Sequence, residues 1–135
     1  MTDKPTFLLD GVETVQSPLH YAVALQKAAS SVGFDWPDVS GIISKIHEET
    51  DEVAAEIAES DHHKLQGEIG DLLFAITNLS RHLNVDPLLA LQQTNQKFYR
   101  RFNYIETQAN ILGQRLAELP LIEMDKLWEQ AKTRS

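Results

Sequence analysis

Residues 48–71 read EETDEVAAEIAESDHHKLQGEIGD, and this stretch decides the fold that we predict. It holds nine carboxylates and one lysine, so its formal charge is −8. The whole chain, with 20 Asp/Glu and 12 Lys/Arg, also has a net charge of −8, so the remaining residues are balanced. The acidity of the protein is therefore concentrated in one segment, which we expect to form the facing ends of two helices and the turn between them.

Acidic residues interrupt the apolar face of each of these two expected helices. In the helix expected over residues 37–60, Glu49 lies between Ile46 and Val53 at steps of three and four. In the helix expected over residues 64–83, Glu68 lies in the same way between Leu65 and Leu72. Because burying an unpaired carboxylate is costly, such groups are paired, hydrogen-bonded or bound to metal.

Three further helices are expected around this pair. Ser17-Pro18 is typical of a helix start, Asp86-Pro87 is typical of another, and Leu119-Pro120 begins a short last helix. No segment shows the sustained alternation of apolar and polar residues that is typical of a β-strand. We predict an all-α fold, an antiparallel four-helix-type bundle completed by dimerisation, with residues 1–16 as a flexible arm and residues 17–135 as the domain.

The composition limits the class of protein. Hydrophobic residues make up 42% and charged residues 24%, which is ordinary for a soluble globular chain. Without cysteine, neither a disulfide framework nor a thiolate metal site can form. The sequence contains neither a signal peptide nor a membrane-spanning run, so we expect a cytoplasmic protein. An acidic chain without a basic patch argues against duplex nucleic acid as a partner.

Glu48, Glu49, Glu52, Glu68 and Asp71 form what we call the acidic cluster. If the two helices pack antiparallel, these side chains can make a cage of oxygen ligands, which suits hard cations such as Mg²⁺, with Mn²⁺ as the alternative. Mg²⁺ held by carboxylates most often serves phosphates. Lys97 and Arg101, four residues apart, fit that interpretation because phosphate oxygens need cations beside the metal.

Simpler interpretations stand beside this one. An acidic helix face is usually solvated, and Lys97 and Arg101 could form surface ion pairs. Gly67 and Gly70 are poor helix formers, which suggests close approach of another helix or a ligand, or else mere tolerance. Glu59 and His62 match one half of a di-iron motif, but they fall at an expected turn and no second copy exists.

The ordered motifs resemble the MazG nucleoside triphosphate pyrophosphohydrolases of the all-α superfamily, most of all their second, catalytic half. The matching segments are GFDWP, EETDEV, GEIGDLLFAITNLSRHL, ALQQTNQKFYRRF and MDKLWEQAK, between residues 19 and 132. The resemblance implies an all-α homodimer that hydrolyses a nucleoside triphosphate to monophosphate and pyrophosphate with Mg²⁺.

The resemblance also implies residue roles. The metal ligands would be Glu49, Glu52, Glu68 and Asp71, and Glu48 or Glu52 would orient the attacking water. The substrate would be bound by Lys64, Lys97, Arg101, Trp128 and Lys132. MazG proteins often carry two such domains and this chain has one, which leaves open any dimer arrangement or regulation that depends on the other half.

Two alternatives remain at this point. One is a related enzyme, such as a dUTP or dCTP pyrophosphatase or a phosphoribosyl-ATP pyrophosphohydrolase. The other is a non-catalytic helical interaction module with a vestigial acidic face. The base specificity is not readable, because Phe34 and Trp36 could stack on a base or simply belong to the core.

Overall fold

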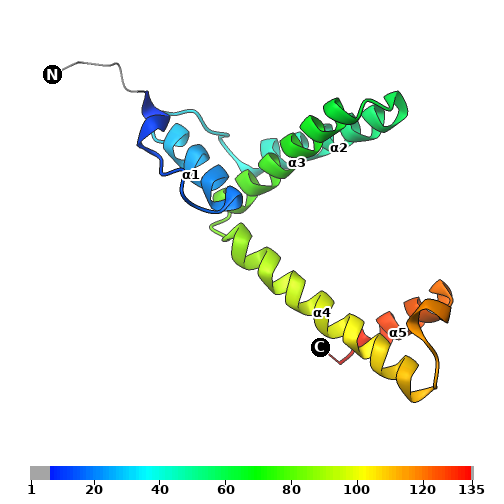
Figure 1. Cartoon of the computed structure of the whole chain (residues 1–135). Coiled ribbons are helices and arrows are strands. Elements are labelled where there is room, and N and C mark those ends of the chain that lie inside the picture. Colours follow the sequence, from blue (N-terminus) through cyan, green and yellow to red (C-terminus); the bar gives the residue numbers. More distant parts are fainter. Residues whose placement is uncertain (1–6, 135) are drawn as a thin grey trace. The chain divides into compact units, whose positions relative to one another are not determined.

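The computed structural model describes residues 7–134, and all its regular elements are helical (Figure 1). No strand occurs in this range, so the prediction of an all-α fold is confirmed. The elements in chain order are η1 (Leu8–Gly11), α1 (Pro18–Ser30), α2 (Val39–Glu59), α3 (His62–His82), α4 (Pro87–Ile111), η2 (Leu116–Glu118) and α5 (Leu121–Lys132).

Side-chain caps set where the helices begin. Ser17 accepts a hydrogen bond from the His20 backbone N–H, as expected from its position before Pro18. The helix expected from residue 37 begins two residues later, because extended Asp38 caps it and accepts from the Ser40 backbone N–H at 2.9 Å. Asp86 accepts from the Leu88 N–H at 2.9 Å and so fixes the start of α4.

Helices α2 and α3 form a tight antiparallel pair. Ser60 adopts the left-handed conformation at φ 59° and ends α2, and Asp61 then accepts hydrogen bonds from the first N–H groups of α3. With a connection this short the second helix must return along the first, and the two lie side by side in Figure 1. The acids before the turn are thereby brought opposite the acids after it.

The chain divides into two compact units between Leu88 and Leu89, and each is described by itself. In the first unit α1 packs against α3, and α3 packs against α2 (Figure 1). Ile42 of α2, 1% exposed, and Ala75 of α3 are buried there. Residues 1–6 of the expected arm lie outside the described residues, while η1 contacts α1, and the division into arm and domain stays a prediction.

The second unit has its own small core. Ile105 and Ala109 of α4 are buried against Leu119, and partly buried side chains of η2 and α5 pack around them. Tyr104 on α4 donates a hydrogen bond from its hydroxyl to Gln130 on α5 at 2.9 Å. None of the helices within residues 7–134 is both long and apolar enough to cross a membrane.

Candidate metal centre and adjoining pocket

Among the described residues, Glu49 is the one acid that is buried. It is 4% exposed, although it lies on a helix whose neighbouring positions Glu48 and Thr50 are exposed. The interruption of the apolar face by Glu49 therefore corresponds to real burial of a carboxyl group. Ionised or not, such a group needs partners to offset its lost hydration.

The acidic cluster expected from the sequence is assembled by α2 and α3. One carboxylate oxygen from each of Glu49, Glu68 and Asp71 lies within 4.8 Å of the others. A second triplet with the same spacing joins Glu48, Glu49 and Glu52, so Glu49 belongs to both. Groups this close could hold a hard cation between the two helices, since Mg²⁺ and Mn²⁺ take carboxylate oxygens.

Several oxygens of this region are buried without a hydrogen-bond partner among residues 7–134. They are Oε2 of Glu49, Oε2 of Glu68 and Oε1 of Glu56. A buried acceptor left unsatisfied destabilises the fold by about 1–3 kcal/mol, more when it is charged. The unpaired oxygens of Glu49 and Glu68 thus fit a cation that would bridge α2 and α3.

Lys45 is a member of this site that the sequence interpretation missed. Its Nζ lies 3.0 Å from Glu49 Oε1 and 3.4 Å from Glu48 Oε1. Hydrogen bonds to Glu49 and then Glu48 raise the pKa of Lys45, so it stays positively charged. The signal was in the sequence, because Lys45 precedes the two acids by three and four residues, which places it on their face of α2.

The neighbouring carboxylates change the pKa of Glu52. A hydrogen bond to Glu68, followed by the negative charge of Glu49, raises the pKa of Glu52 to about 7. In the protein without a cation, Glu52 therefore keeps a proton at pH values where a free glutamate has lost it. Divalent cations bind the deprotonated form, so cation binding would release this proton.

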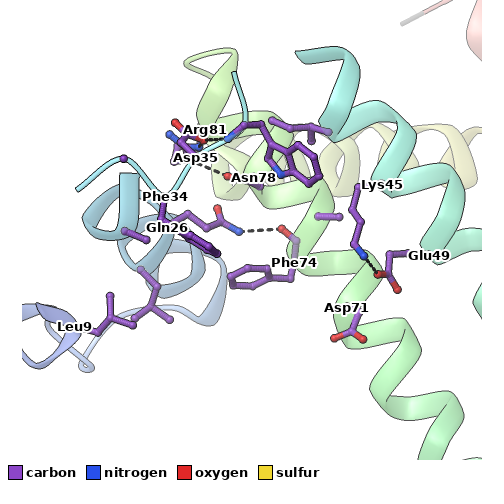
Figure 2. Close-up of a pocket in the computed structure, with 16 residues that line it drawn as sticks. Leu9, Gln26, Phe34, Asp35, Lys45, Glu49, Asp71, Phe74, Asn78 and Arg81 are labelled. Carbon is purple, nitrogen blue, oxygen red and sulfur yellow. Dashed lines mark hydrogen bonds and ion pairs between the residues drawn. The ribbon is translucent and has the colours of Figure 1, made fainter. Parts of the chain in front are cut away.

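A pocket of about 820 Å³ in the first unit adjoins the acidic cluster. Glu49 and Asp71 lie on its wall together with Lys45 (Figure 2). Apolar side chains form most of the remainder, including Phe34, Trp36 and Phe74. The polar residues Gln26, Asn78 and Arg81 also line it. Pockets that are mostly apolar with a few fixed polar groups are typical of small-molecule sites.

The loop that carries Phe34 and Trp36 is tied to the end of α3. Arg81 donates to Asp35 Oδ1 at 2.5 Å, and this hydrogen bond lowers the pKa of Asp35. The His82 ring nitrogen lies 3.2 Å from the Trp36 carbonyl oxygen. These contacts hold the loop beside α3 through Asp35 and the main chain of Trp36, so both aromatic residues stay at the pocket, where they could contact a ligand.

The residues expected to bind substrate lie in different parts of the chain. Lys64 is exposed in the first turn of α3. In the second unit the Arg101 guanidinium lies 5.7 Å from the centre of the Trp128 ring, a cation–π contact. Lys97 is exposed one turn before Arg101, and Lys132 pairs with Glu129 at 3.2 Å. Their roles in binding stay predictions.

Two further expectations can be compared with the structure. Within the described residues of the first unit, no atom beyond the surrounding turns of α3 lies within 4 Å of a Cβ built on Gly67 or Gly70, so no other helix of that unit approaches there; a ligand or a second copy stays untested. Among residues 7–134 the groups with metal-ligand spacing are the two acidic triplets, which include neither Glu59 nor His62.

Comparison with known proteins decides the family. A model of the MazG nucleotide pyrophosphohydrolase domain matches residues 37–105, from just before α2 into α4. The chain belongs to the MazG domain family. The matched range contains every member of the acidic cluster and also Lys97 and Arg101.

The similarity to curated relatives covers more of the chain than residues 37–105. The chain is 46% identical over 114 residues to the nucleoside triphosphate pyrophosphohydrolase/pyrophosphatase MazG of Thermotoga maritima, covering 84% of this chain and 44% of that protein. It is 39% identical over 126 residues to the nucleoside triphosphate pyrophosphohydrolase of Escherichia coli K12, covering 92% and 48%. The chain spans about half the length of these relatives.

Proposed function

We propose that this MazG domain hydrolyses nucleoside triphosphates to nucleoside monophosphates and pyrophosphate with the help of Mg²⁺. The observation that carries the proposal is Glu49, a buried acid with an unpaired oxygen, shared by two carboxylate triplets. The names of the relatives, both nucleoside triphosphate pyrophosphohydrolases, support the reaction class. The pocket of about 820 Å³ beside the acids offers room for the rest of a nucleotide.

We assign the cation to Glu49, Glu52, Glu68 and Asp71. Their oxygens are hard ligands, which suits Mg²⁺ first and Mn²⁺ as an alternative. The bound ion would neutralise charge on the phosphate oxygens and lower the pKa of water beside it. Around it, Glu49 and Glu68 would contribute the oxygens that have no other partner among the described residues.

The reaction proposed is attack of a water oxygen on the α-phosphorus. A new P–O bond forms to the α-phosphorus, the α–β phosphoanhydride bond breaks, and pyrophosphate leaves with the bond's electron pair. Glu48 or Glu52 would orient the water and accept its proton. Both are suited by position, since Glu48 and Glu52 share a triplet with Glu49 and so lie close to the proposed cation and any water beside it.

Cationic side chains would bind the phosphates that the acids themselves repel. We assign Lys97 and Arg101 to this role, because they lie four residues apart on α4 and Arg101 is already held beside Trp128. Lys64 and Lys132 are further candidates, and Trp128 offers a ring that a base or sugar could contact. Each of these assignments is a prediction, which charge reversal would test at the four cations and Trp128→Leu would test at the ring.

We further propose a homodimer, because α4 presents a long apolar seam that the other described residues of the second unit cover only in part. Leu91, Phe98 and Phe102 recur at steps of seven and four along that helix and are 49%, 59% and 37% exposed. A second copy with the same seam would bury it in a self-complementary way. A cytoplasmic location, and the absence of duplex nucleic acid as a partner, likewise stay predictions.

Isotope labelling combined with product analysis tests the reaction directly. The purified protein would be incubated with Mg²⁺, H₂¹⁸O and a panel of ribo- and deoxyribonucleoside triphosphates. The proposal expects pyrophosphate as the direct product and ¹⁸O in the monophosphate, since water attacks the α-phosphorus. Orthophosphate as the first product, or ¹⁸O in pyrophosphate, would overturn the reaction assignment while leaving the metal site standing.

A further inference from the structure

Gln26 of α1 is a buried polar residue that neither the acidic cluster nor the proposed hydrolysis uses. It is 7% exposed and lines the pocket beside Phe34 and Trp36. Its Oε1 is buried and has no hydrogen-bond partner within residues 7–134. An amide buried with an unsatisfied oxygen calls for an explanation, because such atoms usually find a donor.

The orientation of the Gln26 amide is fixed by its nitrogen. Nε2 donates to the Phe74 carbonyl oxygen at 2.9 Å and to Thr77 Oγ1 at 3.3 Å. Thr77 in turn donates its hydroxyl hydrogen to the same Phe74 carbonyl at 2.7 Å, so its oxygen is free to accept from Gln26. Both amide hydrogens are therefore used, and a flipped amide would set its oxygen against the Phe74 carbonyl oxygen.

Gln26 consequently offers the pocket one acceptor and no donor. Figure 2 shows its nitrogen directed to Phe74 and its oxygen on the other side of the amide. A ligand that satisfies this oxygen must bring an N–H or O–H group. Because Oε1 is recessed, the wall must shift slightly to admit the donor, and Phe34, 81% exposed, is the part of the wall with room to move.

We propose that Gln26 contributes to recognition of the nucleobase of the substrate by accepting an N–H hydrogen bond from it. The inference rests on the proposed function, since the same pocket reaches Glu49 and Asp71, where the phosphates would lie. Phe34 and Trp36 provide apolar surface for the rings, and Gln26 provides the single oriented acceptor. The standard nucleobases, each with an amine or imide N–H on the Watson–Crick edge, can make this hydrogen bond, and a base without such an N–H cannot.

Adenine and unsubstituted purine make the sharpest pair of probes. Purine riboside phosphates lack the 6-amino group and carry no N–H donor on the base, yet they keep the shape of adenosine phosphates. The wild-type protein should prefer ATP over purine riboside triphosphate in kcat/KM by roughly tenfold, the value of a hydrogen bond to a buried acceptor. Adenosine monophosphate should likewise bind more tightly than purine riboside monophosphate, with the same ratio of Kd values measured by calorimetry.

Gln26→Leu is the main variant, with Gln114→Leu as its matched control. Gln26→Leu should lower kcat/KM for ATP roughly tenfold and leave purine riboside triphosphate unchanged, so that the preference disappears. Thr77→Val should weaken the preference in part, because it frees the amide to rotate. Gln114 is exposed after α4, and Gln114→Leu should keep the full preference.

The outcomes separate this inference from the proposed function. Equal affinity of the wild-type protein for the two monophosphates would overturn the role of Gln26, whether or not any triphosphate is hydrolysed. A preference that survives in Gln26→Leu would also overturn it. Absence of pyrophosphate release would contradict the proposed function alone, since monophosphate binding needs no hydrolysis and would still report on Gln26.

Discussion

Lys45 Nζ lies 3.0 Å from Glu49 Oε1, while Oε2 of the same buried carboxylate has no hydrogen-bond partner among the described residues. One side of Glu49 is thus balanced by a cation of the chain itself, and the other side is not. This asymmetry is the physical basis for assigning a metal ion to the acidic cluster. It also indicates how the protein keeps a buried acid when no cation is bound.

Glu49→Gln should remove most of the stabilisation that Mg²⁺ provides. A cation that binds only the folded protein raises its melting temperature, and the variant loses the central ligand of both triplets. Thermal melting with and without Mg²⁺ measures the effect. Asp51→Asn, an equal charge change at an exposed position of α2, should keep the full Mg²⁺ shift. Equal shifts in all three proteins would contradict the assignment.

Lys45→Met should destabilise the metal-free protein, because it removes the cation that balances buried Glu49. Mg²⁺ should then restore more stability in the variant than in the wild type. Melting curves in EDTA and in Mg²⁺ give both quantities. Lys126→Met provides the control, since Lys126 forms an ion pair with exposed Glu123 on α5 and not with a buried acid. If Lys45→Met melts like the wild type in EDTA, Lys45 does not balance Glu49.

Glu52 should make the stability of the metal-free protein depend on pH. Its pKa is about 7 in the folded protein against an ordinary value of 4.5, so the folded state holds a proton that the unfolded state has released. The stabilisation that the Glu52 proton gives the folded protein is therefore fully present below pH 4.5 and is lost as the pH rises to about 7. Denaturant melts of wild type and Glu52→Gln should diverge across this window and run parallel above it.

Mg²⁺ binding should show the complementary dependence. Since the ion takes the deprotonated carboxylate, its affinity should increase from pH 5 to about 7 and then level off. Calorimetry in two buffers of different ionisation enthalpy measures the released proton. No proton release at pH 6 would show that Glu52 is already ionised in the metal-free protein.

Gly41 and Gly67 should respond in opposite ways to substitution by alanine. A Cβ on Gly41 would lie 2.7 Å from the Trp36 ring, so Gly41→Ala must displace that ring from the pocket wall. Gly67 has no neighbour within 4 Å among the described residues, and Gly67→Ala should stabilise α3 by roughly 1 kcal/mol. Tryptophan fluorescence and denaturant melts separate the two effects. A less stable Gly67→Ala would indicate a ligand or second copy at that position.

The parts of the fold that local chemistry determines were predictable from the sequence. Apolar residues at steps of three and four gave the helices, and the caps Ser17 and Asp86 gave two of their starts. Glu49 stood out because an acid replaced an apolar residue, and its burial confirms that signal. The helix predicted from residue 37 begins at Val39 because Asp38 caps it, which leaves Pro37 outside the first turn.

Residues whose role depends on distant partners were not predictable. Gln26 resembles any glutamine on an amphipathic helix, and its fixed orientation arises only from Phe74 and Thr77, about 50 positions away. Lys45 had the right spacing, but spacing alone does not distinguish a partner of a buried acid from a surface ion pair. Dimerisation depends on a second copy, whose surface one chain's pattern of apolar residues does not specify.

The most direct test of the central claim is Mg²⁺-dependent pyrophosphate release by wild type, Asp71→Asn and Asp51→Asn, with helicity checked by circular dichroism. Asp71 shares a triplet with buried Glu49, whereas Asp51 belongs to neither triplet. We predict that Asp71→Asn loses at least about 100-fold in kcat/KM with its helicity intact, and that Asp51→Asn retains the activity of the wild type. Full activity in Asp71→Asn would contradict the metal-binding role of the acidic cluster.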